Sequence, residues 1–406
     1  MKVAVIGAGL AGLNAGRILS EYVDVDVYES TAKGGLAGSF CTDDYCIEVF
    51  YHHFFRQDSY LIDLLDELKL GNRVVWNTSR VGQAFRGTIY PLNTPLEILR
   101  YPGMSLLDKI RLAKFTVTAK KRKYELFDST SVIDGLRRDA GDRLIERFFL
   151  PLLKSKFGEN YSDVSYAWLL ARVTLRSNRK LSGEELGYLR GGFHQLIDRL
   201  SDGLEIIGER ARIRKDGRWN VNGTDYDAVV FTAPLPELGE LGRRMGIQDV
   251  RYQSSICLLI SMDSPFTDDL YWINYDAEPF GATIEHTNFM PPEDYGEHLM
   301  YVASYTTPDR VYSLTDSEIF RLYLSALRKY GLDENSIRWW RVFRAKFSGP
   351  VYEKDFRSKI TPYRVADGFY MAGMTSDTNY PERSMNGSLL AGKKAAEIIL
   401  RDFSLL

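Results

Sequence analysis

The sequence predicts an α/β fold with more than one domain, and three observations support this prediction. The chain has 406 residues, which is long enough for two or three domains. Near the N-terminus, a short apolar strand pattern runs directly into a glycine-rich turn and a helical pattern. Near residue 370, a second strand pattern is followed by a loop and an amphipathic helix, and several further strand patterns lie between these two ends.

The composition is that of a globular protein and argues against several classes of function. Apolar residues make up 45% and charged residues 26% of the chain, which argues against disorder of the whole chain. The net charge is −2, so we expect no general electrostatic attraction to nucleic acid. No apolar run approaches the roughly 18 residues that a membrane-spanning helix needs.

The cysteines and the N-terminus bear on the cellular compartment. Cys41, Cys46 and Cys257 are odd in number and contain no CxxC pair, so we expect neither a disulfide scaffold nor a thiolate zinc site, and no other metal site. Glycines interrupt the apolar N-terminal stretch, and no cleavage site follows, which argues against a signal peptide. We therefore expect a reducing, cytoplasmic setting.

Residues 2–28 have the pattern of a nucleotide-binding βαβ unit: a strand, the motif GxGxxG, a helix and a second strand. In this motif Gly7 allows the tight turn, Gly9 lets backbone approach a pyrophosphate, and Gly12 lets the helix pack close to the sheet. The helix N-terminus offers N–H groups to the phosphates, and Glu29 can accept hydrogen bonds from ribose hydroxyls. We therefore predict dinucleotide binding.

A second glycine turn, GGLAGS at residues 34–39, follows Glu29 and favours FAD over NAD. The two glycine turns together resemble those of the flavoprotein superfamily of amine oxidases, protoporphyrinogen oxidases, phytoene desaturases and UDP-galactopyranose mutases. The resemblance implies FAD as the cofactor. It also implies the FAD-binding residues Gly7, Gly9, Leu10, Ala11, Gly12, Glu29, Ser30, Gly34, Gly35, Leu36, Ala37, Arg212, Gly373, Met385 and Asn386.

The C-terminal pattern supports the same resemblance. A strand pattern ends at Gly373, and an amphipathic helix covers residues 389–399. In the superfamily this helix begins beneath the flavin pyrimidine ring, where its N-terminus stabilises negative charge near N1 and O2, so the Met385 N–H is expected to meet O2. Relatives place an acidic residue just after the strand-end glycine; here Asp377 substitutes, or the contact is absent. Because this region has no cysteine, the FAD is expected to be noncovalent.

The middle of the chain implies an interleaved architecture. Residues 186–198 resemble the turn at which these flavoproteins re-enter the FAD domain, and residues 204–213, with Arg212, resemble the strand that reads the adenine edge. The predicted fold is therefore a Rossmann-like FAD-binding domain (1–75, 186–245 and 365–406) interleaved with a substrate domain (76–185 and 246–364). The substrate domain is expected to combine helices, including Asp142–Phe157, with a mixed antiparallel sheet of strands Ser255–Met262, Tyr271–Tyr275, Ala282–His286, Leu299–Tyr305 and Trp339–Phe347.

The candidate catalytic residues are His53, His52, Tyr380 and Arg383. In relatives the stretch that contains these two histidines passes across the flavin near N5, where a histidine can move a proton or hold a substrate oxygen; the alternative is a structural histidine within the aromatic cluster. Arg383 could bind a substrate phosphate or carboxylate, or could lie on the surface.

Further candidates lie in the predicted substrate domain. Trp339 and Trp340 could line a pocket, and only one of the two is expected to pack into the core, because neighbours on a strand face opposite ways. Cys257 is expected to be a buried apolar residue rather than a redox thiol.

Residues 106–123 have the pattern of a basic amphipathic helix. This pattern is compatible with peripheral attachment to anionic lipid on the inner membrane face, and equally describes a solvated helix face.

The predicted function is oxidoreduction of a small-molecule substrate, with hydride passing from a C–H or C–N bond to noncovalent FAD. Two alternatives stay open. One is a mutase-like flavoenzyme that acts on a nucleotide-sugar, and the other is a flavin-free binding module, as in the Rab GDP-dissociation inhibitors.

Overall fold

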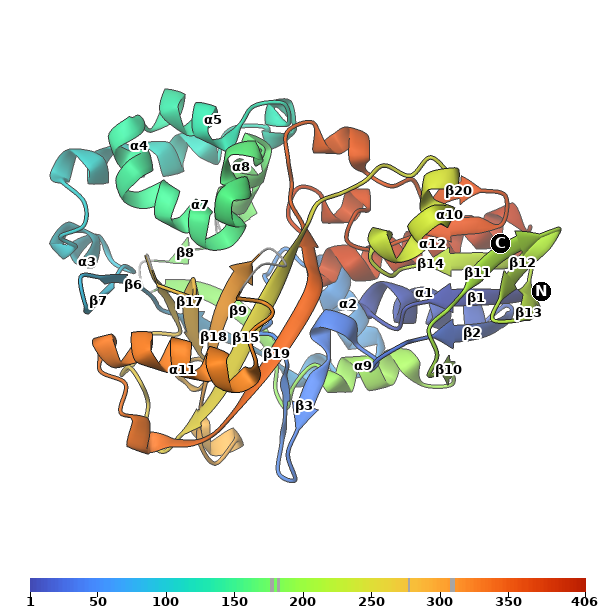
Figure 1. The fold of residues 1–406 in the computed structure, drawn as a ribbon, viewed down its shortest axis with the longest axis horizontal. Coiled ribbons are helices and arrows are strands. Elements are labelled where there is room, and N and C mark those ends of the chain that lie inside the picture. The colour runs from blue at the N-terminus through green and yellow to red at the C-terminus, as the bar shows by residue number, and fades with distance from the viewer. Residues whose placement is uncertain (176–178, 181–182, 277, 307–310) are drawn as a thin grey trace. The chain divides into compact units, whose positions relative to one another are not determined.

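The computed structural model describes residues 1–175, 179–180, 183–276, 278–306 and 311–406. The chain forms two compact units, each assembled from separate stretches of sequence (Figure 1). Unit 1 comprises Met1–Val75, Leu189–Arg251 and Arg357–Leu406, and unit 2 comprises Trp76–Tyr188 and Tyr252–Phe356. The chain therefore passes from one unit to the other after residues 75, 188, 251 and 356, where the sequence predicted boundaries after 75, 185, 245 and 364.

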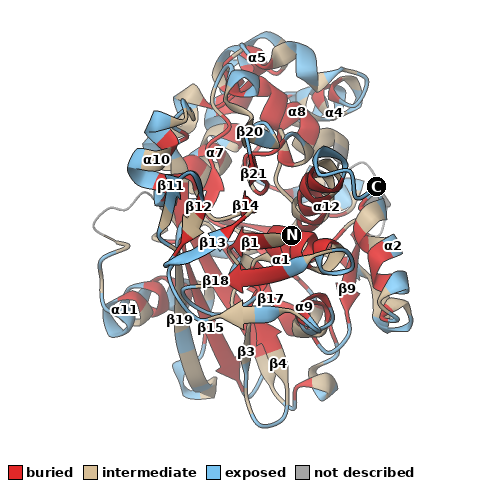
Figure 2. Cartoon of the chain, turned by 90° about the vertical axis from the view of Figure 1, so that its right-hand side faces the viewer, coloured by how far each residue is buried: buried red, intermediate tan, exposed pale blue. Residues whose placement is uncertain are grey.

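Unit 1 is built on a six-stranded sheet with the order β10-β2-β1-β14-β21-β20. Its strands are β1 (Lys2–Ile6), β2 (Asp24–Tyr28), β10 (Glu205–Ile207), β14 (Ala228–Phe231), β20 (Arg364–Ala366) and β21 (Phe369–Met371). All pairs are parallel except β20–β21. The central strands are continuously apolar because both of their faces are buried, as Figure 2 shows for β1 and β14. The predicted Rossmann-like sheet is confirmed.

The helices and small sheets of unit 1 surround this sheet. The helices are α1 (Leu10–Ser20), α2 (Ser59–Glu67), α9 (His194–Ser201), α10 (Gly239–Arg244) and α12 (Met385–Asp402). The remaining strands are β3 (Ser39–Cys41) and β4 (Cys46–Glu48), which form a hairpin, and β11 (Ile213–Asp216), β12 (Arg218–Val221) and β13 (Thr224–Tyr226), which form a small antiparallel sheet.

Helices α1 and α12 cross closely, which brings the two ends of the sequence together (Figure 1). A Cβ added to Gly392 would lie only 2.1 Å from the Ala11 carbonyl oxygen, so the small side of α12 sits directly on α1. The Asn14 side-chain amide donates to the Leu389 carbonyl at 2.8 Å across this crossing. The N-terminal glycine motif and the C-terminal helix therefore form one structural region.

Unit 2 is built on a seven-stranded mixed sheet with the order β19-β15-β18-β17-β16-β6-β7. Its strands are β6 (Val81–Phe85), β7 (Thr88–Pro91), β15 (Tyr252–Met262), β16 (Trp272–Asn274), β17 (Ala282–Glu285), β18 (His298–Thr306) and β19 (Ile337–Pro350). Only the β16–β6 pair is parallel. The five strands predicted for residues 255–347 are all present. A further sheet contains β5 (Val74–Ser79), β9 (Gly183–Leu189) and β8 (Arg179–Lys180).

The helices of unit 2 include one departure from the sequence prediction. They are α3 (Pro95–Arg100), α4 (Leu106–Ala119), α5 (Val132–Asp139), α6 (Asp142–Leu144), α7 (Leu150–Phe157), α8 (Tyr166–Leu175) and α11 (Asp316–Leu327). The single helix predicted at Asp142–Phe157 is divided by a π-helical turn at Ile145–Phe149. Pro151 explains the division, because its nitrogen has no N–H and its ring excludes the normal hydrogen bond to the preceding turn.

The expectation that the cysteines form no disulfide is wrong for one pair. Cys41 and Cys46 are joined by a disulfide across the β3–β4 hairpin, where the strand register places them opposite each other. The CxxC criterion missed this pair because the bond depends on a hairpin rather than on sequence spacing. Cys257 lies outside the disulfide and is buried on β15, as expected. The cysteines therefore do not support the reducing, cytoplasmic setting that was inferred from them.

Candidate cofactor site and active-site residues

The first glycine turn leaves open backbone at the start of α1. Gly9 is the N-cap residue, with φ −77° and ψ 178°, and no side chain among the described residues caps the helix. The first N–H groups of the helix therefore have no partner within it. A Cβ added to Gly9 would meet no described atom within 4 Å, whereas a Cβ on Gly12 would lie 1.9 Å from the Gly7 carbonyl oxygen. Gly12 is thus required for packing, and Gly9 borders free space.

The second glycine turn lies against the first. The Gly34 N–H donates to the Ala8 carbonyl at 2.7 Å, and a Cβ on Gly35 would lie 3.4 Å from the Gly9 Cα. Gly34 and Gly35 both have positive φ, 99° and 55°, and the chain continues as a 3₁₀ turn at Gly35–Ala37 that contains Leu36. The predicted residues of both turns are therefore adjacent.

Ser39 ends the second turn and was not among the predicted site residues. Its hydroxyl oxygen is buried and has no hydrogen-bond partner among the residues that the structure describes. A buried hydroxyl without a partner costs free energy, so this oxygen is suited to a polar group of a ligand.

Glu29 lies at the carboxyl end of β2, next to the first glycine turn. Its Oε2 accepts the Ala8 N–H at 2.9 Å, and its Oε1 accepts the N–H and hydroxyl of Thr31, each at 2.8 Å. These bonds fix the carboxylate at the sheet edge, and the side chain stays half-exposed. Ser30, the next residue, is exposed.

The start of α12 is held by polar side chains. Ser384 caps the helix by accepting the Gly387 N–H at 2.9 Å, and Asn379 accepts the Ser384 N–H at 3.0 Å while donating to the Gly373 carbonyl at 2.8 Å. Asn386 Oδ1 accepts the Leu61 N–H at 2.9 Å, which ties the helix start to α2. The predicted residues Gly373, Met385 and Asn386 therefore belong to one cluster.

Two further residues that the sequence singled out, Asp377 and Arg212, bond to other groups of unit 1. The Asp377 carboxylate is already engaged by the Tyr363 hydroxyl at 2.5 Å and the Lys394 ammonium at 2.9 Å. Arg212 is exposed before β11, and its backbone N–H donates to Asn222 Oδ1 at 2.8 Å.

His52 is held as a neutral imidazole in one tautomer. Its Nδ1 lies 2.6 Å from the Phe50 carbonyl oxygen, so this nitrogen carries the proton of the neutral ring and Nε2 is left unprotonated. Burial, together with the positive charge of Arg383, lowers the pKa of His52 to about 4. His52 and Arg383 are thus brought within electrostatic reach of each other.

The other predicted catalytic residues occupy different surroundings. The His53 ring meets the Phe55 ring edge-on at 5.5 Å. Tyr380 is half-buried just before α12, and its backbone N–H donates to the Asp377 carbonyl at 3.1 Å. For His52, the described contacts therefore set the tautomer and lower the pKa.

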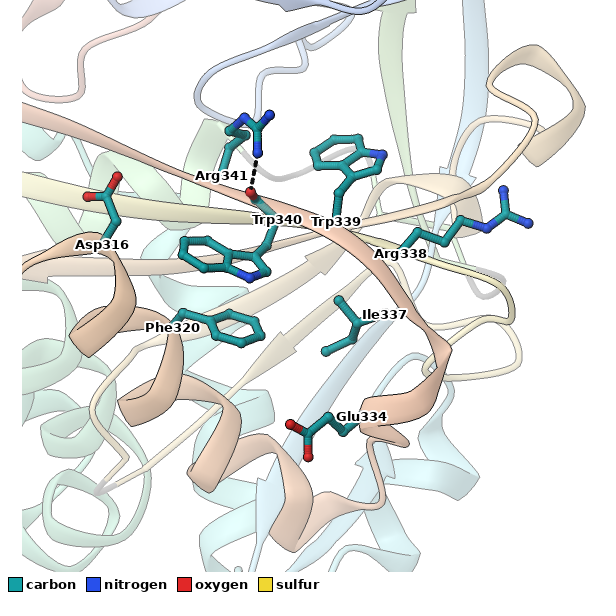
Figure 3. A pocket seen from close by; sticks show the side chains of 8 residues that line it. All are labelled: Asp316, Phe320, Glu334, Ile337, Arg338, Trp339, Trp340 and Arg341. Carbon is teal, nitrogen blue, oxygen red and sulfur yellow. Dashed lines mark hydrogen bonds between the residues drawn. The ribbon is translucent and has the colours of Figure 1, made fainter.

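Unit 2 contains a separate pocket of about 630 Å³ between α11 and β19 (Figure 3). Trp340 stacks on Phe320 with ring centroids 4.5 Å apart and an interplanar angle of 7°, while the Trp339 indole N–H donates to Glu297 at 3.1 Å. Both tryptophans line this pocket, and Trp340 is the one that packs against the apolar core of unit 2, as predicted for one member of the pair. The other lining residues are Asp316, Glu334, Ile337, Arg338 and Arg341, so no predicted histidine or FAD-binding residue belongs to this pocket.

Comparison with known proteins identifies the family. The model of the flavin-containing amine oxidoreductases matches residues 10–400. The chain belongs to this family. The flavin-containing amine oxidoreductases are oxidoreductases that use FAD, so this chain is an enzyme of that class with FAD as its cofactor.

Individual relatives are distant. A coproporphyrinogen III oxidase of Staphylococcus aureus is 22% identical over 51% of this chain, and that alignment spans only half of the relative's own length. A 15-cis-phytoene desaturase of Narcissus pseudonarcissus is 23% identical over the whole chain and 80% of the relative. A crystal structure from Exiguobacterium sp. 255-15, described as that of a protoporphyrinogen oxidase, is 18% identical, and the match covers 99% of both chains with a TM-score of 0.77. At this identity the structural match establishes the fold of the flavin-containing amine oxidoreductases.

Proposed function

We propose that the chain oxidises a small-molecule substrate by transferring hydride from a C–H or C–N bond to noncovalently bound FAD, as desaturases and oxidases do. The observation that carries the proposal is that the two glycine turns pair at Gly9 and Gly34, and that α1, which begins at the first turn, crosses α12 within unit 1. When bound, FAD would supply the hydride acceptor and pass the electrons to a further acceptor.

The residues present fit FAD. The N–H groups of Leu10, Ala11 and Gly12 at the start of α1 would face the diphosphate, and the free space at Gly9 would admit it. The Ser39 hydroxyl, which has no hydrogen-bond partner among the described residues, ends the second glycine turn. Glu29 would accept from ribose hydroxyls. The capped start of α12 would place the positive end of its dipole, with the Met385 N–H, toward the negatively charged part of the flavin.

His52 and Arg383 are the proposed catalytic pair. The unprotonated Nε2 of His52 would accept a proton from the substrate, and the Arg383 guanidinium would bind an anionic group of the substrate, a phosphate or a carboxylate. His53 and Tyr380 are proposed to shape the substrate side of this site.

Paired glycine substitutions test the cofactor site. Gly9→Val should leave the thermal stability of the apoprotein unchanged, because its side chain enters free space, and should abolish FAD binding, because it fills that space. Gly12→Val should instead lower thermal stability through its clash with the Gly7 carbonyl. If fluorescence titration showed a normal FAD affinity for Gly9→Val, the diphosphate would not bind at Gly9, and the proposed cofactor site would be refuted.

Anaerobic flavin bleaching tests the reaction. Amines, polyprenoids, porphyrinogens and nucleotide-sugars would be offered in turn, and one of the first three classes should bleach the flavin. His52→Ala should slow that bleaching 100-fold or more, the usual range for a general base, while FAD binding persists. Turnover of a nucleotide-sugar with no net bleaching would favour the mutase reaction instead.

We also propose that unit 2 attaches peripherally to anionic lipid through residues 106–123. Helix α4 exposes Leu106, Leu107, Ile110 and Val117, each by 57–64%. The same stretch carries the basic residues Lys109, Arg111, Lys114, Lys120, Lys121, Arg122 and Lys123. At a membrane surface, the exposed leucines would contact the acyl chains, and the lysines would contact the acidic headgroups. None of the described helices is both long and apolar enough to span a bilayer.

Vesicle sedimentation tests this attachment. The protein should bind vesicles that contain phosphatidylglycerol and not vesicles of pure phosphatidylcholine, and Leu107→Gln with Ile110→Gln should remove at least 90% of the bound fraction. Leu322→Gln, at an exposed leucine of α11, is the matched control and should bind normally. Equal binding by the double variant and the control would exclude α4 as the contact.

A further inference from the structure

Glu48 is a buried carboxylate in unit 1 that has no role in the proposed chemistry. It ends β4 with 1% of its surface exposed, and its Oε1 accepts the Phe193 N–H at 2.6 Å, across 145 positions of sequence. A short hydrogen bond from a backbone N–H to a buried carboxylate is stronger than a neutral one. Glu48 therefore fixes the backbone at the start of α9.

The turn before α9 is shaped to present this N–H. Gly191 and Gly192 both have positive φ, 91° and 100°, and a Cβ added to Gly192 would lie 3.3 Å from Glu48 Oε1. Two consecutive glycines thus let the backbone approach the carboxylate closely.

Phe193 also contacts the segment that follows Glu48. Its ring is fully buried and meets the His52 ring edge-on at 6.5 Å and the Phe54 ring at 6.1 Å. Residues 50–53 are neither helix nor strand, so no backbone ladder orients the His52 ring. Its orientation depends on the Phe50 carbonyl and on Phe193.

We infer that Glu48 is a positioning residue, which holds His52 in place by fixing Phe193 at the start of α9. The carboxylate binds the backbone of Phe193, and the ring of the same residue supports the imidazole four positions after Glu48. The catalytic meaning of this role rests on the proposed function of His52, but the positioning itself is a property of the folded chain.

NMR titration of the imidazole tests the inference in the full FAD-loaded chain. With five histidines in the sequence, the His52 signal can be assigned by its loss in His52→Gln. Wild type and Glu48→Gln, which keeps the acceptor oxygen, should show the same depressed pKa. Glu48→Ala should raise the His52 pKa by a unit or more, because the released ring regains water. Phe193→Leu, which keeps the N–H bond and removes the ring, should do the same and serves if Glu48→Ala does not fold.

The matched control is Asp26→Ala, which removes another buried carboxylate of unit 1, one that accepts the Tyr226 hydroxyl at 2.6 Å. It should lower thermal stability without moving the His52 titration. An unchanged His52 titration in both Glu48→Ala and Phe193→Leu would overturn the inference, and so would an equal shift in Glu48→Gln and Glu48→Ala. Failure of His52 as a catalytic base would leave these titrations unaltered, so the two proposals fail separately.

Discussion

His52 in unit 1 and Glu285 in unit 2 show the same physical effect with opposite signs. Burial disfavours the charged form of each, so it lowers the pKa of His52 to about 4 and raises the pKa of Glu285 to about 7. His52 is therefore neutral at physiological pH. Glu285 instead exchanges its proton close to neutral pH, with three donors from Phe266 and Thr267 around it.

Glu285 predicts a pH-dependent stability. Its pKa is raised on folding, so the native state binds the proton more tightly, and the resulting stabilisation is present below pH 4.5 and is lost as the pH rises to 7. A shift from 4.5 to about 7 corresponds to about 3 kcal/mol. Relative to Glu285→Gln, the wild type should therefore lose about this much free energy of unfolding between pH 4.5 and 7.5, measured by urea denaturation. Parallel curves for the two proteins would contradict the prediction.

At the scale of elements, the crossing of α1 and α12 depends on one small residue. Gly392→Ala should destabilise unit 1 by about 1–3 kcal/mol, because the added methyl group would lie 2.1 Å from the Ala11 carbonyl oxygen and the helices must separate. FAD affinity should fall with it, since the two helix starts move apart. The partly exposed neighbour Lys393 provides the control, Lys393→Ala, which should change the melting temperature by less than about 1 °C. Wild-type stability of Gly392→Ala would show that the crossing is loose.

The hairpin disulfide leads to a second prediction at this scale. Closing so short a loop restricts the unfolded chain only modestly, so Cys41→Ser with Cys46→Ser should cost about 2 kcal/mol. Thiol titration of the native protein should find no rapidly reacting group, because Cys257 is buried. After denaturation one thiol should appear without reductant and three with it. Three thiols without reductant would mean that the bond does not form.

The sequence predicted those elements whose signals are local. The strand–turn–helix of residues 2–19 and the strands of residues 255–347 were readable because their apolar spacing follows from burial on one or both faces. The partners of Glu48 and Cys41 were not readable, because a hydrogen bond to Phe193 and a disulfide across a hairpin depend on tertiary register.

At the scale of the whole molecule, the proposed cofactor site lies within unit 1. On addition of FAD, backbone hydrogen exchange should therefore slow in the two glycine turns, residues 7–12 and 34–39, and at the start of α12, residues 384–387. Gly9→Val should show none of this protection. Slowed exchange that excludes residues 384–387 would place the flavin ring elsewhere.

The interleaved chain also sets an order of synthesis. Unit 2 is complete once residue 356 has left the ribosome, whereas unit 1 lacks β21 and α12 until residues 369–402 have followed. One of the two parallel partners of β14, the strand β21, is thus among the last strands translated. A nascent chain would hold β1, β2 and β14, with the β21 edge of β14 unpaired, while the 105 residues of Tyr252–Phe356 and those that follow are made. Flavin would therefore be captured late in the synthesis of each molecule.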